Sequence, residues 1–287
     1  MMNTTTLSVL ISVYKSEKPC YLDSSLESVI KNQTLKPNNV IIVEDGPLTT
    51  GLYDVISKWC NNPDVPITII KNEVNMGLTK SLNRGLEYVN TDLVARMDSD
   101  DMARPNRFEL QVKFFNENPN IDILGGAIHE IDENGNDLCD RYYPLDHESV
   151  CKSICKANPI AHPTVMIRKR VFDSGLKYNE SFRTNQDLAL WFDCLLAGFR
   201  IANLSDIILN FRRQKSVYKR RRKKKNLWRE FRIYCIGIKR LHGFFSYKYI
   251  YPIVRLCLKL MPTFVVKWAY NSRIRRTVTD SNKNSKI

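Results

Sequence analysis

Short β-branched runs alternate with helix-like stretches along the first hundred residues, and this alternation limits the fold more than any other feature of the chain. The expected strands are Leu7–Tyr14, Asn39–Val43, Pro66–Lys71 and Asp92–Met97. The helical patterns between them are Tyr21–Gln33, Gly51–Trp59 and Gly77–Val89. Strands and helices that alternate at this spacing are typical of βαβ units, whose sheet is mostly parallel and buried. The sequence therefore predicts an α/β fold with a mostly parallel sheet and flanking helices.

Polar side chains gather where three of these expected strands end. They are Ser12 and Tyr14, then Glu44 and Asp45, and then Asp98, Asp100 and Asp101. Ligands of open α/β sheets bind beyond the carboxyl ends of the strands. We therefore expect the functional site at this edge of the sheet.

The charge of the chain is divided between two regions. Of its 44 basic and 30 acidic residues, 23 basic residues but only Glu230 and Asp280 lie from Arg212 onward, so the earlier part holds 21 basic and 28 acidic residues. An acidic body can hold divalent cations, whereas a basic one attracts polyanions such as nucleic acid or anionic lipid. The eight cysteines form no closely spaced framework and the chain starts without a signal-peptide pattern, which predicts a reduced, cytoplasmic setting.

Three aspartates in four residues, Asp98, Asp100 and Asp101, crowd negative charge at the end of an expected strand. Carboxylates this close raise one another's pKa unless a cation neutralises them. A Mg²⁺ or Mn²⁺ ion held by carboxylate and phosphate oxygens is the usual remedy, and it stabilises charge on a leaving diphosphate. The alternative is a solvated acidic turn that caps a helix starting near Pro105. The order of strand, acidic cluster and helix favours the metal and phosphate interpretation.

Six ordered stretches make the chain resemble the family-2 glycosyltransferases, and more narrowly the bacterial members that build O-antigen and exopolysaccharide repeat units. They are SVLISVYK (Ser8–Lys15), VEDG (Val43–Gly46), NMGLTKSLNRGL (Asn75–Leu86), ARMDSDDMARPNRFELQ (Ala95–Gln111), HPTVMIRKRVF (His162–Phe172) and NQDLALW (Asn185–Trp191). The resemblance implies a GT-A (Rossmann-like) catalytic domain over residues 1–215. It also implies a nucleotide-sugar donor, for which family tendency favours UDP, and a divalent metal cofactor, Mn²⁺ or Mg²⁺.

The resemblance also assigns roles at the donor site. The residues that it places against the nucleotide base are Ser12, Tyr14 and Asp45, the last accepting a hydrogen bond from uracil. Those that it places at the ribose and the metal-bound diphosphate are Asp98 and Asp100, with Asp101 as a further metal ligand. The alternative for Tyr14 is a core side chain.

Asp187 stands where the family carries its catalytic base. An inverting transfer is a single displacement, in which one carboxylate deprotonates the acceptor hydroxyl as it attacks the anomeric carbon. The alternative role is a cap for the helix that starts at this point, and the two roles are compatible. His162 would line the acceptor side, or else it is a structural histidine. Where relatives often show Tyr-Arg-Val-His, Phe211–Gln214 reads FRRQ, and this departure leaves a metal or diphosphate role of that stretch open.

Basic and apolar residues mix in the last quarter of the chain. Lys219–Lys225 is a run of seven cations, and Tyr247–Tyr270 combines aromatic and aliphatic side chains with Lys or Arg every few positions. The longest uncharged stretch there, Leu260–Val266, is too short to span a bilayer. We expect residues 216–276 to form a basic, amphipathic helical region on an anionic membrane surface, and residues 277–287 to be a disordered tail. The alternative partner is nucleic acid, which we do not expect.

These features predict an inverting, metal-dependent glycosyltransferase. It would move a hexose or N-acetylhexosamine from a UDP-sugar to a polyprenyl-diphosphate-linked saccharide, in surface polysaccharide biosynthesis at the cytoplasmic face of the inner membrane. Two alternatives stay open, a nucleic-acid-binding protein whose acidic cluster is structural and a nucleotidyltransferase. Against the second, the sequence has no Gly-rich phosphate loop near its amino terminus.

Overall fold

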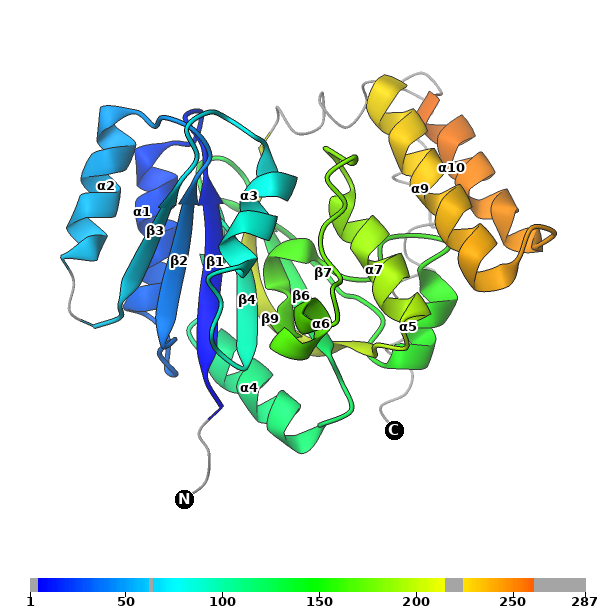
Figure 1. Ribbon diagram of the computed structural model, residues 1–287, viewed down its shortest axis with the longest axis horizontal. Coiled ribbons are helices and arrows are strands. Elements are labelled where there is room, and N and C mark those ends of the chain that lie inside the picture. Colours follow the sequence, from blue (N-terminus) through cyan, green and yellow to red (C-terminus); the bar gives the residue numbers. More distant parts are fainter. Residues whose placement is uncertain (1–4, 62–63, 215–223, 261–287) are drawn as a thin grey trace.

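The computed structural model describes residues 5–61, 64–214 and 224–260, and a nine-stranded sheet lies at its centre (Figure 1). The strands follow one another across the sheet in the order β3-β2-β1-β4-β8-β6-β9-β5, and β7 pairs with β6. Their bounds are β1 (Leu7–Val13), β2 (Asn39–Glu44), β3 (Ile67–Lys71), β4 (Leu93–Asp98), β5 (Met102–Ala103), β6 (Ile123–Ile131), β7 (Asp137–Arg141), β8 (Met166–Arg168) and β9 (Ile201–Arg212).

The first four strands are parallel, as the alternation of strands and helices predicts. Beyond β4 the sheet is mixed, because β8 lies antiparallel to β4 and to β6, while β9 runs parallel to β6. The carboxyl ends of β1, β2 and β4 therefore lie at one edge, which is the upper edge in Figure 1. The α/β fold is confirmed, and the polar clusters at the strand ends share that edge.

Helices cover both faces of the sheet. Their bounds are α1 (Pro19–Ile30), α2 (Thr50–Cys60), α3 (Leu78–Leu86), α4 (Arg107–Glu117), α5 (His147–Ser153), α6 (Lys169–Asp173), α7 (Gln186–Leu196), α9 (Lys224–His242) and α10 (Ile250–Leu260), with 3-10 turns η1 (His162–Thr164) and η2 (Tyr247–Tyr249). Successive strand residues point to opposite faces. In β1, Val9 and Ile11 join the core beneath α1, α2 and α4, whereas Leu10 joins the core with α3, α7 and α9.

Of the two C-terminal helices, α9 packs against α7 and α10 packs against α9. Gly237 of α9 allows this approach, because a Cβ atom there would lie 2.4 Å from the ring of Phe192 in α7. The same ring meets Tyr234 edge to face at 6.2 Å, and Arg240 forms an ion pair with Asp193. The predicted helical C-terminal extension is thus confirmed for the described residues, where it is joined to the α/β part by apolar and ionic contacts.

Part of the expected C-terminal region lies outside the described residues. Residues 215–223, which hold most of the basic run Lys219–Lys225, are among them, as are residues 261–287 with the expected tail. The boundary at residue 215 stays a prediction. Among the described helices, none has both the length and the apolar character that crossing a membrane requires.

Candidate active site

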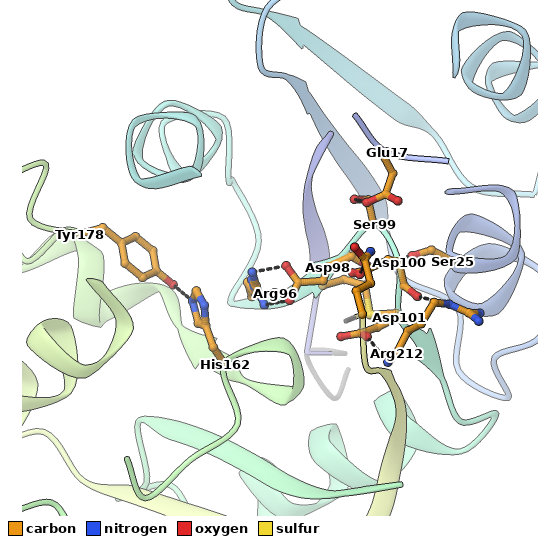
Figure 2. A network of polar contacts seen from close by, with 12 residues as sticks. Glu17, Ser25, Arg96, Asp98, Ser99, Asp100, Asp101, His162, Tyr178 and Arg212 are labelled. Atoms are coloured by element: carbon orange, nitrogen blue, oxygen red, sulfur yellow. Dashed lines mark hydrogen bonds and ion pairs between the residues drawn. The ribbon is translucent and has the colours of Figure 1, made fainter. Parts of the chain in front are cut away.

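The acidic cluster lies at the end of β4, as expected. One carboxylate oxygen from each of Asp98, Asp100 and Asp101 lies within 4.8 Å of the others (Figure 2). Ser12 pairs with Asp98 in the register of β1 and β4, and Ser25 of α1 donates a hydrogen bond of 3.0 Å to the Asp98 carbonyl. The N-cap of the next helix, α4, is Asn106, so the interpretation of the aspartates as its cap is wrong.

A buried arginine holds Asp98. Both terminal nitrogens of the Arg96 guanidinium contact the Asp98 carboxylate, one of them at 2.7 Å (Figure 2). Burial opposes the charge of Arg96, but the Asp98 carboxylate outweighs it and raises the pKa of the guanidinium. Arg107, which is fully buried, donates to the Arg96 carbonyl at 2.9 Å. Sequence reasoning missed Arg96, although its place two residues before Asp98 on one strand face was a usable signal.

Asp100 has an amide partner rather than a cation. Gln214 donates to its Oδ2 at 2.8 Å, and the Arg212 side chain donates to its backbone carbonyl at 3.0 Å. Burial, then the carboxylates of Asp98 and Glu17, raises the pKa of Asp100 to about 7. The site therefore holds more negative charge than the described protein groups neutralise.

The surroundings of the Asp101 carboxylate indicate whether the acidic cluster fits a metal ion. Its side chain is fully buried, and its Oδ1 accepts a hydrogen bond of 2.8 Å from the Arg212 backbone N–H. Its Oδ2 has no hydrogen-bond partner among the described residues. Burial, then the charges of Asp100 and Asp98, raises the pKa of Asp101 well above its usual value. A buried, unpartnered carboxylate oxygen beside a second carboxylate fits a hard cation such as Mg²⁺ or Mn²⁺.

The end of β9 reaches this cluster, which the sequence did not indicate. Arg212 lies 111 residues beyond Asp101 and Gln214 lies 114 beyond Asp100, yet both are bonded to the acidic turn. The FRRQ stretch departs from the family pattern, which left its metal or diphosphate role open. The structure places Arg212 and Gln214 of this stretch against the acidic turn.

The residues expected at the nucleotide base lie at the same edge. Ser12 is half-buried in β1, and Tyr14 is 41 % exposed just beyond it, so the core alternative for Tyr14 is wrong. Asp45 follows β2, and its carboxylate accepts hydrogen bonds from the backbone N–H groups of Met76 at 2.7 Å and Gly77 at 3.0 Å. Asp45 therefore holds the turn that starts α3, and its contact with uracil stays a prediction.

Asp187 lies in the first turn of α7. Its Oδ2 accepts a hydrogen bond of 2.6 Å from Asn158, and its side chain is half-buried. The N-cap of α7 is Asn185 rather than Asp187, and at φ 56° Asn185 is the one non-glycine residue with a positive φ in the described ranges. Backbone strain of this kind persists where the surroundings enforce it, and it clusters at functional sites.

His162 is buried and already has partners. Its Nε2 lies 2.8 Å from the Tyr178 hydroxyl (Figure 2), and its ring meets Trp191 edge to face at 6.0 Å. Burial, then the charge of Arg96, lowers the pKa of His162 well below its usual value. The geometry fits the structural alternative better than contact with an acceptor.

The fold is similar to that of solved structures. The crystal structure of S. aureus TarS 1-349 superposes with a TM-score of 0.66 at 19% identity, over 90% of this chain and 73% of that one. The same protein in complex with UDP superposes with a TM-score of 0.61 at 18% identity, over 89% of this chain and 70% of that one. Identity this low shows the fold alone, which is the GT-A type of α/β fold.

Sequence comparisons then give the family. The model of "Glycosyl transferase family 2" matches residues 8–175. The amylovoran biosynthesis glycosyltransferase AmsE of Erwinia amylovora is 33% identical over 92% of this chain and 97% of its own length. The UDP-Gal:alpha-D-GlcNAc-diphosphoundecaprenol beta-1,3-galactosyltransferase of Escherichia coli is 32% identical over 96% of this chain and 98% of its own length. The chain belongs to the family-2 glycosyltransferases of the exopolysaccharide and O-antigen type, so it is an enzyme. These matches favour neither a nucleic-acid-binding protein nor a nucleotidyltransferase.

Proposed function

We propose that this enzyme transfers a hexose or N-acetylhexosamine from a UDP-sugar to a saccharide carried on a polyprenyl diphosphate, with inversion at the anomeric carbon. The observation that carries the proposal is the acidic cluster at the end of β4, where buried Asp101 keeps one oxygen without a described partner. The relatives support the chemistry. The E. coli protein is named for a UDP-Gal donor and a diphosphoundecaprenol-linked acceptor, and TarS has been solved with UDP-GlcNAc.

On the donor side, Asp100 and Asp101 would hold a Mn²⁺ or Mg²⁺ ion. When bound, the ion would neutralise the charge that develops on the leaving diphosphate. Asp98, oriented by Arg96, would meet the ribose at the same strand end. Gln214 keeps Asp100 in place through its amide hydrogen bond, so this residue would act by positioning.

The base-binding side would be formed by the ends of β1 and β2. Ser12 and exposed Tyr14 would lie against the uracil ring, since an exposed ring beside a strand end offers a stacking surface. Asp45 would accept a hydrogen bond from the ring through lone pairs that Met76 and Gly77 leave available. A carboxylate has about four acceptor sites, which is enough for both tasks.

Asp187 would be the general base. It lies in the first turn of α7, and the Asn158 amide orients its carboxylate. The base would take the proton from the acceptor hydroxyl as that oxygen attacks the anomeric carbon. One displacement of this kind inverts the configuration and needs no covalent nucleophile.

The test of this function is a transfer assay. The enzyme would receive UDP-Gal, UDP-Glc, UDP-GalNAc or UDP-GlcNAc with Mn²⁺ and a short-chain, diphosphate-linked GlcNAc acceptor. We expect transfer from one of these α-linked donors, and NMR of the product should show a new β-linkage. A product with an α-linkage would contradict the single displacement, and a lack of transfer from every donor would contradict the function.

We also propose that the catalytic part, residues 1–215, is held at the cytoplasmic face of the inner membrane by residues 216–276. The outer side of α10 and the segment before it support this, because their exposed apolar side chains are Phe244, Phe245, Tyr247, Ile250, Ile253, Val254 and Leu258. Apolar area together with nearby cations favours binding to an anionic lipid interface.

Changing both Phe244 and Phe245 to Asp should weaken sedimentation with phosphatidylglycerol-containing vesicles about tenfold or more, since two rings no longer insert and two negative charges meet the lipid. The rings are 68% and 97% exposed, so the fold should tolerate the change. Leu138→Asp/Tyr142→Asp, on the exposed β7 hairpin, adds the same charge elsewhere and should sediment like wild type. Equal sedimentation of both variants would contradict the membrane surface.

A further inference from the structure

A groove opens between the loop that precedes α7 and the first half of α9. Its volume is about 540 Å³, which is within the range of small-molecule sites. The residues that line it are Ser181, Phe182, Lys225, Trp228, Arg229 and Arg232. The roles proposed above for the donor and the base use none of these side chains, and the exposed apolar side chains proposed to meet the membrane are different residues.

Three cations stand on the α9 side of this groove. Lys225, Arg229 and Arg232 are spaced by four and three residues, so they project from the same face of the helix. Within the described ranges, the α9 residues that form ion pairs are Glu230 and Arg240. The three cations of the groove form no ion pair with a described residue. Like charges at this spacing destabilise a helix, and near its N-terminus they also oppose the helix dipole. An anion bound between them would offset both effects.

The groove also offers a flat apolar surface. Trp228 is 55% exposed, and its ring meets Phe231 edge to face at 5.8 Å. Phe182 belongs to the opposite wall. A fixed indole beside cations suits a ligand in which an anionic group adjoins a sugar ring or an isoprenoid chain.

The wall formed by the loop before α7 is held by hydrogen bonds. Thr79 of α3 donates to the Phe182 carbonyl at 2.9 Å. The Ser181 backbone N–H and hydroxyl both donate to Asn179, at 3.0 Å and 2.6 Å. The groove therefore lies between fixed elements, and a ligand would not have to order this wall on binding.

One wall of the groove is close to the candidate base along the chain. Ser181 precedes Asp187 by six residues, which limits their separation to about 20 Å. The loop before α7 and the first turn of α9 lie at the upper edge in Figure 1, where β1, β2 and β4 end. A molecule in this groove would thus place a hydroxyl near Asp187 without occupying the acidic cluster.

We propose that this groove binds the diphosphate of the acceptor, an inference that rests on the proposed function. The planar guanidinium groups of Arg229 and Arg232 match phosphate oxygens with paired donors, and Lys225 adds a point charge. Trp228 packs against the sugar or the first isoprene unit next to the diphosphate. The enzyme thereby recognises the link between saccharide and lipid, while the sugar reaches the base.

The test is a calorimetric titration with a short-chain alkyl diphosphate ester of GlcNAc and with its monophosphate analogue. UDP and Mn²⁺ are kept saturating, so that neither ester can enter the donor site. Wild type should bind the diphosphate ester more tightly than the monophosphate ester. Arg229→Gln/Arg232→Gln should lose about tenfold or more in affinity for the diphosphate ester, with a smaller loss for the monophosphate ester. Lys113→Gln/Lys152→Gln removes the same charge from α4 and α5 and should match wild type.

Three results would overturn the proposal. In the first, the arginine variant binds the diphosphate ester as tightly as wild type. In the second, its affinity for UDP falls instead, which would assign the groove to the donor. In the third, it binds the ester normally but loses affinity for phosphatidylglycerol vesicles, which would assign the arginines to lipid headgroups. Failure of the proposed function would appear separately, because wild type would then bind no UDP and transfer no sugar.

Discussion

Asp187→Asn is expected to lower the rate of sugar transfer by about 10²–10⁴-fold, which is the range that a general base contributes. Asparagine keeps an oxygen that can accept the Asn158 hydrogen bond, so the local geometry should survive. It cannot take a proton from the acceptor hydroxyl at neutral pH. The loss should therefore fall on kcat, while the Kd for UDP stays as in wild type, and stopped assays with parallel calorimetry measure both.

Asp193→Asn is the matched control for this prediction. Asp193 lies in the same helix, and its ion pair with Arg240 is partly exposed, with side chains 24% and 52% accessible, so its removal should cost little stability. We expect this variant to transfer sugar at nearly the wild-type rate. If Asp187→Asn also kept nearly the wild-type kcat, the base would have to be another residue.

Asp101→Asn is expected to raise the melting temperature of the metal-free protein and to lower the rate of sugar transfer. The buried carboxyl has one oxygen without a described partner, and such a group costs folding free energy. Asparagine can still accept the Arg212 backbone hydrogen bond while removing the charge. The metal-free variant should therefore melt a few degrees higher than wild type, at about 2–4 °C per kcal/mol. Mn²⁺ should no longer raise its melting temperature, and transfer should fall about 10²–10³-fold.

The control for this variant is Asp206→Asn, which changes an exposed aspartate of β9. Its melting temperature with and without Mn²⁺ should match that of wild type. Should Asp101→Asn still gain stability from Mn²⁺, the ion would be bound elsewhere and the acidic cluster would be structural.

The sequence was informative where the proposed site is built from residues that are close together along the chain. The β-branched runs marked β1 to β4, because parallel strands buried on both faces show near-continuous apolar runs. The acidic turn after β4 and the helix that begins near Asp187 were also visible as local patterns. These segments and the residues directly after them contain every residue proposed to contact the donor or to act as the base, but not Gln214, which would position Asp100.

Contacts between distant segments were not predictable in this way. Gln214 and Arg212 reach the acidic turn only because β9 runs beside β6 and β5, and no local pattern shows that pairing. Gly237 is similar, since a glycine within a helical pattern gives no sign that it faces Phe192. The groove at Arg229 and Arg232 depends on this docking of α9. The groove therefore could not be predicted from a run of basic residues in the sequence.

The proposed donor site requires that the edge where β1, β2 and β4 end binds a nucleotide diphosphate with a divalent metal. Calorimetric titration of the purified protein with UDP, GDP and TDP, each with and without Mn²⁺, measures this binding. We expect UDP to bind in the presence of Mn²⁺, to lose most of its affinity without the ion, and to bind Asp101→Asn poorly in either condition. If no nucleotide binds with or without Mn²⁺, the acidic cluster is not a donor site and the account is wrong.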